Sequence, residues 1–424
     1  MIRISLYLAL AALSSVSIAH ATQVSRIQIE GRRWTRAWVI ERELAFCVGD
    51  TLRMEALATT RNRLLNLAIF NRVDVSADSA GTVTIGLVEA WHLWPLVSLN
   101  LEETQLSELF ESPRRFFEGT SLDLGAVDLN FLGRAANFWA FARMGTSRGG
   151  AINYRTRWFS PGLPLFVRAH FRNLRISNRH AAVLGLERSL DNTRAELQVG
   201  TREGRHARVG IKLRYESVQE EPLWAGVAAP RDKVGHGGVF LVIDRRDLEW
   251  YPSKGSYVWL EGNYIGGDRH YFHSESDARA FWPLTKGMRP MVLALRLRGG
   301  TASSGMPAWG HWFFGFNTGF RGYRTEKSEA DGYLSGAAEL RFPLTRIVYV
   351  DLPFGDRFRR LPFGLNGLVF LERTELRLGR QRSELLATGI GLACRVPYVQ
   401  ILEVDFSLSA EGKSEFGATI GMAL

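Results

Sequence analysis

Apolar and polar residues alternate along most of the chain from about Leu93 onward, a period that is typical of β-strands. In one segment apolar side chains share one face and arginines share the other: Met291, Leu293, Leu295 and Leu297 against Ala294, Arg296 and Arg298. Other segments repeat this pattern, with Leu340 and Phe342 against Glu339 and Arg341, and with Leu402, Val404, Phe406 and Leu408 against Glu403, Asp405 and Ser407. One lipid-facing side and one wet side suit a transmembrane β-barrel better than a soluble sandwich.

The last residues form a further apolar face that runs to the C-terminus. The residues of this terminal strand are Phe416, Gly417, Ala418, Ile420, Met422 and Leu424. An apolar strand at a chain end needs a partner, and closing a barrel supplies one, because lipid tolerates no open sheet edge. At roughly 20 residues per strand with its turn, residues 93–424 accommodate about 16 antiparallel strands.

Residues 22–92 follow a different pattern, with an order of strand, helix, helix, strand and strand. A strand is expected from Val24 to Glu30, and a short helix is expected from Thr35 as its N-cap to Leu44. A second helix is expected to restart after Gly49-Asp50-Thr51 and to carry Leu57, Leu64 and Ala68 on one face. Strands at 73–77 and 82–89 complete a small α+β domain.

The first 21 residues are set apart from the fold. Arg3 precedes an apolar run, and Ala19-His20-Ala21 has the small residues that signal peptidase requires. Residues 1–21 are therefore predicted to be a cleaved export signal. No later stretch reaches the ~18 to 20 apolar residues of a membrane-spanning helix, so the mature chain is expected to be periplasmic, secreted or an outer-membrane barrel.

Composition and charge narrow the range of partners. The chain has 42 Gly and 25 Phe but only 2 Cys, so it does not depend on a disulfide framework, although Cys47 and Cys394 leave one bridge open in an oxidising compartment. The formal charge of +10 comes without a clustered basic run. For an exported chain this favours arginines in a wet lumen or at lipid phosphates, and no nucleic-acid partner is expected.

The sequence gives little support to an enzyme. Gly145-Thr146-Ser147-Arg148-Gly149 matches G-x-S-x-G, but strands flank it where a nucleophile elbow requires a strand and then a helix. His270 and His273 fall on opposite faces of a strand, which disfavours a shared metal. We expect no catalytic residue, metal or cofactor.

Several motifs resemble known families of exported proteins. Residues 22–92 resemble a polypeptide-transport-associated (POTRA) domain through Ile27-x-Ile29-x-Gly31, Gly49-Asp50 and the step from Leu64 to Val73. The remainder resembles the barrel of the bacterial surface antigen family, the BamA- and TamA-like outer-membrane assembly factors. The motifs that carry this likeness are Asn130–Arg134, Asp244-Arg245-Arg246-Asp247 with Pro252 and Gly255, and Gly319-Phe320-Arg321-Gly322-Tyr323 with Glu339. The chain departs from the family at Glu372, where an aspartate is usual, and at Leu424, where an aromatic residue is usual.

The resemblance implies that a loop re-enters the barrel lumen with Phe320, Arg321, Gly322 and Tyr323 at its tip. A partly desolvated guanidinium needs a carboxylate partner, so Glu339 and Glu372 on the inner wall are the candidate partners of Arg321. A plain lumen position for these two carboxylates, without special pairing, is the alternative.

The resemblance also implies a function in outer-membrane protein assembly. The strand ending at Leu424 is expected to pair weakly with a first barrel strand near Leu122 to Leu129, so that the seam opens and offers its edge to a client strand. Expected partners are outer-membrane lipids, unfolded outer-membrane or secreted clients, and an inner-membrane or periplasmic protein that binds the POTRA domain in the periplasm. The alternatives are a translocation pore for a dedicated partner and a passive or structural barrel.

Overall fold

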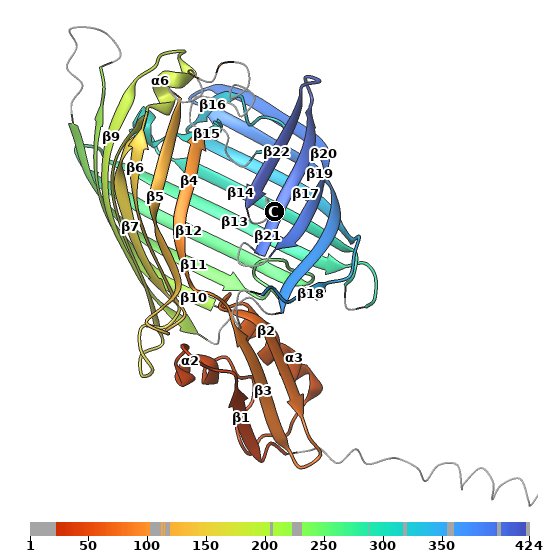
Figure 1. Cartoon of the computed structure of the whole chain (residues 1–424). Coiled ribbons are helices and arrows are strands. Elements are labelled where there is room, and N and C mark those ends of the chain that lie inside the picture. The colour runs from red at the N-terminus through yellow and green to blue at the C-terminus, as the bar shows by residue number, and fades with distance from the viewer. Residues whose placement is uncertain are drawn as a thin grey trace, which may run out of the picture.

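The structure is a computed structural model of the 424-residue chain, with a small unit of helices and strands at one end of a large β-barrel (Figure 1). It describes residues 23–101, 112, 114, 119–203, 207–222, 231–287, 289–316, 320–353, 360–396 and 400–420. The predicted export signal lies outside the described residues. Within them, neither length nor hydropathy qualifies any helix as a membrane span.

The front unit, which we define as residues 23–92, is a three-stranded sheet that packs against two helices. Its elements are β1 (Arg26–Glu30), α2 (Ala37–Glu41), α3 (Met54–Leu65), β2 (Phe70–Ala77) and β3 (Thr82–Glu89). The central strand β3 pairs in parallel with β1 and antiparallel with β2. Ile40 and Leu64 from the helices and Val83 and Ile85 from β3 are fully buried together, because each element turns its apolar face to the same core.

Two details of the predicted helices were wrong. The first helix begins at Ala37, with Arg36 at its N-cap position, and the buried Thr35 hydroxyl instead accepts a hydrogen bond of 2.9 Å from Asn130 Nδ2 in the barrel. The second helix begins at Met54 and ends at Leu65, so Ala68 lies beyond it in a left-handed conformation with φ of 59°. At Thr35 a contact with the barrel takes the place of the predicted helix cap.

The barrel wall is one antiparallel sheet whose strands follow one another in a ring. Its strands are β4 (Leu93–Leu101), β5 (Thr120–Phe131), β6 (Ala136–Gly145), β7 (Arg148–Thr156), β8 (Leu165–Ser177), β9 (Ser189–Glu203), β10 (Ala207–Glu220), β11 (Arg231–Asp244), β12 (Gly255–Gly267), β13 (Tyr271–Pro283), β14 (Val292–Ala302), β17 (Gly332–Pro343), β18 (Val348–Val350), β19 (Leu361–Leu378), β20 (Gln381–Val396), β21 (Gln400–Ser409) and β22 (Ser414–Ile420). The three-residue strand β18 pairs with the part of β19 that lies beyond the pairing of β19 with β17. Without β18, the described ring has sixteen long strands. A helix, α6 (Arg179–Val183), connects β8 to β9.

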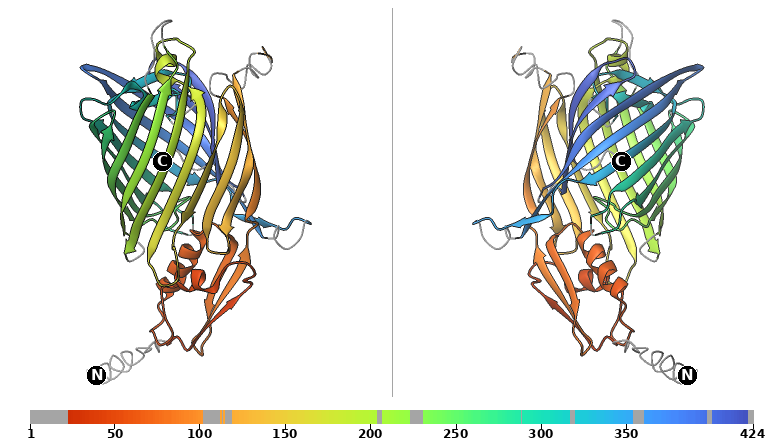
Figure 2. Two further views of the ribbon diagram at one scale, coloured as in Figure 1. Left: turned by 90° about the vertical axis from the view of Figure 1, so that its left-hand side faces the viewer. Right: turned by 90° about the vertical axis from the view of Figure 1, so that its right-hand side faces the viewer.

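The ring has a seam where its two ends meet. The strand order places β22 beside β4, and Figure 2 shows the blue C-terminal strands next to the orange first strands of the wall. The ring is closed by the pairing of β22 with β4, and registers among the described residues join the other pairs of neighbouring long strands. The predicted seam partner was wrong, because Leu122–Leu129 lies in β5, which is flanked by β4 and β6, so the neighbour of the terminal strand is β4.

The alternation of residues has the predicted consequence for the two faces of the wall. Leu297 and Phe406 are 54% and 50% exposed on the outside, whereas Ala294, Glu403 and Asp405, at positions of the opposite parity, are buried inside the barrel. A strand turns successive side chains to opposite faces, so the charged residues of the wall collect in the lumen. The inner wall is therefore the place where the chemistry of this protein is concentrated.

Glu89, at the end of β3, holds the segment that contacts the barrel. Its carboxylate accepts hydrogen bonds from the backbone N–H groups of Arg33 (3.2 Å), Trp34 (2.9 Å) and Thr35 (2.9 Å). Burial raises the pKa of Glu89, but these hydrogen bonds outweigh burial and hold its pKa below the ordinary value. Trp34 and Arg36 continue the contact, donating to the backbone carbonyls of Asn130 at the end of β5 and of Leu132 in the β5–β6 turn, at 3.0 and 3.1 Å.

We predict that acid loosens this segment through Glu89. Because the pKa is lower in the folded protein, the stabilisation is fully present above the unfolded value of about 4.3 and is lost as the pH falls through the folded value. Glu89→Gln should lower the hydrogen-exchange protection of residues 33–35 about threefold at pH 7, with little further loss at pH 3. Glu41→Gln, an exposed position on α2, is the control; equal protection in wild type and Glu89→Gln at pH 7 would contradict the prediction.

Candidate functional site

A long loop between β14 and β17 folds back against the inner wall of the barrel. This inner loop, residues 303–331, carries a short helical turn η1 (Ala308–Gly310) and a hairpin of β15 (Trp312–Gly315) and β16 (Lys327–Ala330). Phe320 and Tyr323 are buried in an apolar cluster with Phe314 of the hairpin and with Leu376 and Leu385 of the wall. The predicted motif therefore lies inside the barrel, although Gly319 falls outside the described residues.

Arg321 is the buried centre of this loop. Its Nε donates to Glu372 Oε1 at 2.6 Å, and its Nη1 donates to Glu339 Oε2 and to Glu403 Oε1, both at 3.0 Å. Nη2 forms a further ion pair with Glu372. The three carboxylates come from β19, β17 and β21, so one guanidinium ties three strands of the wall to the loop.

The surroundings of Arg321 explain how its charge is kept in a buried place. The side chain is 1% exposed and lies over the ring of Phe370, with Cζ 3.6 Å from the ring centroid. Burial lowers the pKa of Arg321, but the charges of Glu372, Glu339 and Glu403 outweigh it and raise the pKa above the ordinary value. A second arginine, Arg341, also pairs with Glu339, so two cations share the three carboxylates.

The residues after Arg321 bind the strands that lead to the seam. Gly322 has φ of +84°, and a Cβ there would lie 2.7 Å from the Cβ of Ala387, so only glycine fits this turn against β20. The Tyr323 hydroxyl donates to the Leu386 carbonyl at 3.1 Å. Arg324 forms a bidentate ion pair with Asp405 of β21, at 3.0 and 2.7 Å.

The seam strand takes part in the same contacts. Glu415 of β22 accepts from the backbone N–H of Arg324 at 2.8 Å, and Gly417 leaves room for the Arg324 side chain, since a Cβ at Gly417 would overlap the guanidinium. Phe416 is 74% exposed on the outside. Ile420 pairs through its backbone with Leu402, and Met422 and Leu424 lie outside the described residues.

The structure thus brings the predicted partners Glu339 and Glu372 to Arg321 and adds residues that the sequence reasoning missed. Glu403, Asp405 and Glu415 were not assigned a role, although the alternation had placed Glu403 and Asp405 on the polar face of one strand. What the sequence lacked was the position of the loop tip along the barrel axis, because this depends on the packing of Phe320 and Tyr323 in the lumen.

A second segment enters the lumen from the opposite end. This mouth loop, residues 245–254, connects β11 to β12 and contains the Asp247 and Pro252 of the predicted motif. Asp247 Oδ1 accepts from the backbone N–H of Ser253 at 2.9 Å, which closes the turn. Trp250 and Tyr251 pack against Leu368, Phe370, Ala393 and Ile401 on the far wall, so the loop reaches across the barrel.

The mouth loop approaches the inner-loop site from below. Tyr251 faces Arg341, whose Cζ lies 5.5 Å from the ring centroid, and Arg341 in turn is paired with Glu339. Burial raises the pKa of Tyr251 to about 12, so the phenol stays neutral. Arg395 of β20 lies over the ring of Trp250, with Cζ 4.4 Å from the ring centroid.

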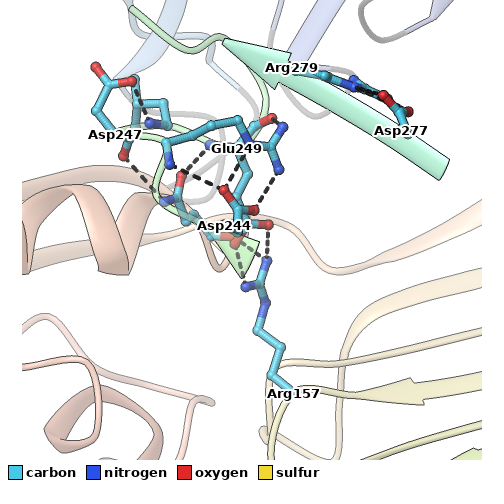
Figure 3. Close-up of polar contacts among 9 residues, drawn as sticks. Arg157, Asp244, Asp247, Glu249, Asp277 and Arg279 are labelled. Carbon is cyan, nitrogen blue, oxygen red and sulfur yellow. Dashed lines mark hydrogen bonds and ion pairs between the residues drawn. The ribbon is translucent and has the colours of Figure 1, made fainter. Parts of the chain in front are cut away.

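Figure 3 shows the contacts that join the mouth loop to the rest of this end of the barrel. Arg157, which follows β7, forms a bidentate ion pair with Glu249 at 2.7 and 2.8 Å and also donates to the backbone carbonyl of Asn66 at 2.6 Å. The Asn66 side chain accepts from the backbone N–H of Glu249 at 2.9 Å. Since Asn66 caps α3, the front unit, the mouth loop and the wall meet at one point.

Other candidate sites from the sequence have structural roles in the described residues. Gly145–Gly149 spans the turn from β6 to β7, where the Ser147 backbone N–H donates to the Ser121 hydroxyl at 2.8 Å. Cys47 and Cys394 are free thiols. Within the part of the chain that the structure describes, no group of three His, Cys, Asp or Glu side chains is placed to hold a metal ion.

Comparison with known proteins gives a family match and several structural neighbours. The model of the Omp85 superfamily domain matches residues 130–355. BamA from Haemophilus ducreyi lacking POTRA domains 1–3 is similar with a TM-score of 0.53 and 15% identity, over 94% of this chain and 84% of that chain. CdiB from Escherichia coli is similar with a TM-score of 0.59 and 12% identity, over 95% and 75%. No curated protein matches the sequence. At these identities the structural likeness concerns the fold.

We predict strong coupling between Arg321 and its three carboxylates. Arg321→Ala leaves buried negative charge without its partner and should cost about 1 to 3 kcal/mol of barrel stability, after allowance for screening by lumen water. In double-mutant cycles with Glu339→Gln, Glu372→Gln and Glu403→Gln, the combined loss should be smaller than the sum. The readouts are the temperature at which the folded gel band is lost and the protease sensitivity of the inner loop.

The control cycle combines Arg279→Ala with Glu372→Gln. Arg279 pairs with Asp277 at 2.8 Å on another part of the wall, so this pair should be additive. Additivity of Arg321→Ala with all three glutamates would show that the ion pairs do not hold the loop.

Proposed function

Because this chain belongs to the Omp85 superfamily, whose members are outer-membrane β-barrels, we propose that it assists the insertion and assembly of other proteins in the outer membrane. The observation that carries the proposal is the seam. The ring closes there between β22 and β4, and opening this pairing would expose the backbone N–H and C=O groups of both strand edges to an incoming strand. Binding through these groups tolerates many client sequences.

The inner loop supports one side of this seam. Arg321, Arg324 and Tyr323 attach it to β20 and β21, and Glu415 attaches it to β22 itself. These contacts hold the C-terminal strands in place from inside the lumen. In the proposed mechanism the C-terminal side is therefore the rigid edge, and movement of β4 and the strands after it opens the seam.

We propose that the front unit is a single POTRA domain in the periplasm. Its strand and helix order and the contacts of Asn66 with the mouth loop support this assignment. A client or a partner protein bound at the front unit would change the position of α3, and the mouth loop would pass this change to Tyr251 and Arg341. The chemistry is binding alone, with no covalent step and no cofactor.

Two alternatives use the same barrel in other ways. A translocation pore for a dedicated partner would need the inner loop and the mouth loop to leave the lumen, because both cross it. A passive channel would need no seam at all. The seam-locking experiment below separates these alternatives from an assembly factor.

We predict that the mature protein begins near Thr22, fractionates with the outer membrane, and migrates faster on detergent gels before boiling than after it. A barrel whose strands are joined by continuous hydrogen-bonded ladders resists unfolding by detergent and stays compact. N-terminal sequencing and gel mobility of purified membranes provide the measurements. A soluble fraction whose mobility does not depend on heating would refute the membrane placement.

We further predict that locking the seam abolishes activity without unfolding the barrel. One cysteine in β4 and one in β22, at positions whose Cα atoms lie within about 7 Å, are introduced after Cys47 and Cys394 have been replaced by serine. In liposomes the reduced protein should speed the folding of a small client barrel, and the oxidised protein should not. If neither form exceeds empty liposomes while ion conductance is present, a pore is the better account.

A further inference from the structure

Charges on the lumen wall formed by β7 to β10 are arranged unevenly along the barrel axis. Toward the far end from the front unit, cations and carboxylates pair closely: Arg194 with Glu216 at 2.7 Å, and Arg214 with Glu196 at 2.7 Å. Lys212 pairs with Glu261 in the same region. In each pair the cation balances the charge of the carboxylate, so little net charge remains on that part of the wall.

Three inward-facing arginines at the end near the front unit are different. Arg155 and Arg168 lie directly opposite each other on β7 and β8, and Arg208 is at the start of β10. Arg168 donates to the Asn153 side chain at 3.4 Å, and Arg208 lies over Phe166 at 5.6 Å. Among the described residues, none of the three has a carboxylate within 4 Å.

The nearby carboxylates are already occupied. Glu249 is held by both Nη atoms of Arg157, and Asp244 is held by Arg246 at 2.9 and 2.6 Å. Arg155 lies within electrostatic range of Arg157, Arg168 and Arg208, and of Glu249, which Arg157 already holds. Like charges directly opposite on neighbouring strands are destabilising, so an arrangement of this kind favours binding of an anion from outside the chain.

The size of the cluster indicates what kind of anion fits. Neighbouring strands lie about 4.8 Å apart, so the three steps from β7 to β10 cover about 14 Å. A single phosphate or carboxylate does not span this width. An extended peptide rises about 3.4 Å per residue, so a stretch of about four residues spans it and presents alternate carboxylates to one side.

We propose that Arg155, Arg168 and Arg208 form a vestibule at the mouth of the lumen that binds an acidic segment of an unfolded polypeptide. The Arg155 side chain is exposed to the lumen water, so a ligand reaches it without unfolding of the wall. The vestibule lies beside Arg157, which contacts Asn66 of the front unit, so a chain held by the front unit is delivered next to it. This inference rests on the proposed function, since it names a client feature that the assembly site selects.

The test uses the full-length mature protein in detergent micelles and a fluorescent hexaglutamate peptide, with hexaglutamine as the neutral control. Wild type should bind hexaglutamate, measured by fluorescence anisotropy, with an affinity that falls as salt is raised. The variant Arg155→Gln/Arg168→Gln should bind about tenfold more weakly, equivalent to ~1.4 kcal/mol. The matched variant Arg148→Gln/Arg231→Gln removes the same charge from the outward rim and should bind as wild type does.

A charge-preserving variant separates binding from a folding defect. Arg155→Lys/Arg168→Lys should retain most of the binding, and all variants should keep the heat-dependent gel shift. Equal binding by the two glutamine variants, or equal binding of hexaglutamate and hexaglutamine, would overturn the inference. Failure of peptide binding with client folding intact refutes the vestibule alone, whereas intact peptide binding with no client folding refutes the proposed function alone.

Discussion

The organisation of this barrel depends on one buried cation. Arg321 lies in the lumen, where its charge is tolerated only because carboxylates from β17, β19 and β21 receive it together. Removing water from four charged groups is costly, and the cost is offset only while loop and wall stay in register. The same contact therefore fixes the loop, braces three strands and holds the C-terminal half of the wall against which the seam strand β22 is placed.

Because Arg321 fixes the inner loop, the two strands of the seam are supported differently. β22 is bound from inside through Glu415 and lies on the Arg324–Asp405 pair, whereas β4 has no such support from the inner loop among the described contacts. One strand of the seam is thus braced from the lumen, whereas β4 is held by its pairing with β5 and β22. An edge that is held rigid is a suitable template for a new strand once its partner strand moves away, because its backbone groups are already in the extended geometry.

Two loops from opposite ends divide the lumen, and they meet through Glu339. The inner loop reaches Glu339 by Arg321, and the mouth loop reaches it by Tyr251 and Arg341. The mouth loop is also bound to the front unit at Asn66. These contacts form a continuous connection between the front unit and the wall beside the seam. A movement of the charged groups in this connection would change the contacts at both of its ends.

The sequence by itself determined the periodic features of this protein. Alternation assigned the strands and their wet face, Leu57 and Leu64 marked the buried side of α3, and the aromatic–Arg–Gly motif marked a loop in the lumen with Glu339 and Glu372 as its partners. The strand and helix inferences hold because they depend only on residues near each other in sequence or on the parity of a strand, whereas the partners of Arg321, 18 and 51 residues away, came from the resemblance to a known family. The tertiary structure alone decided that Glu403 and Asp405 share the loop, that Thr35 bonds to Asn130 instead of capping a helix, and that β4 is the neighbour of the last strand. Each of these contacts joins residues that are far apart in the chain, and their meeting depends on the stagger of the strands around the barrel, which no local pattern encodes.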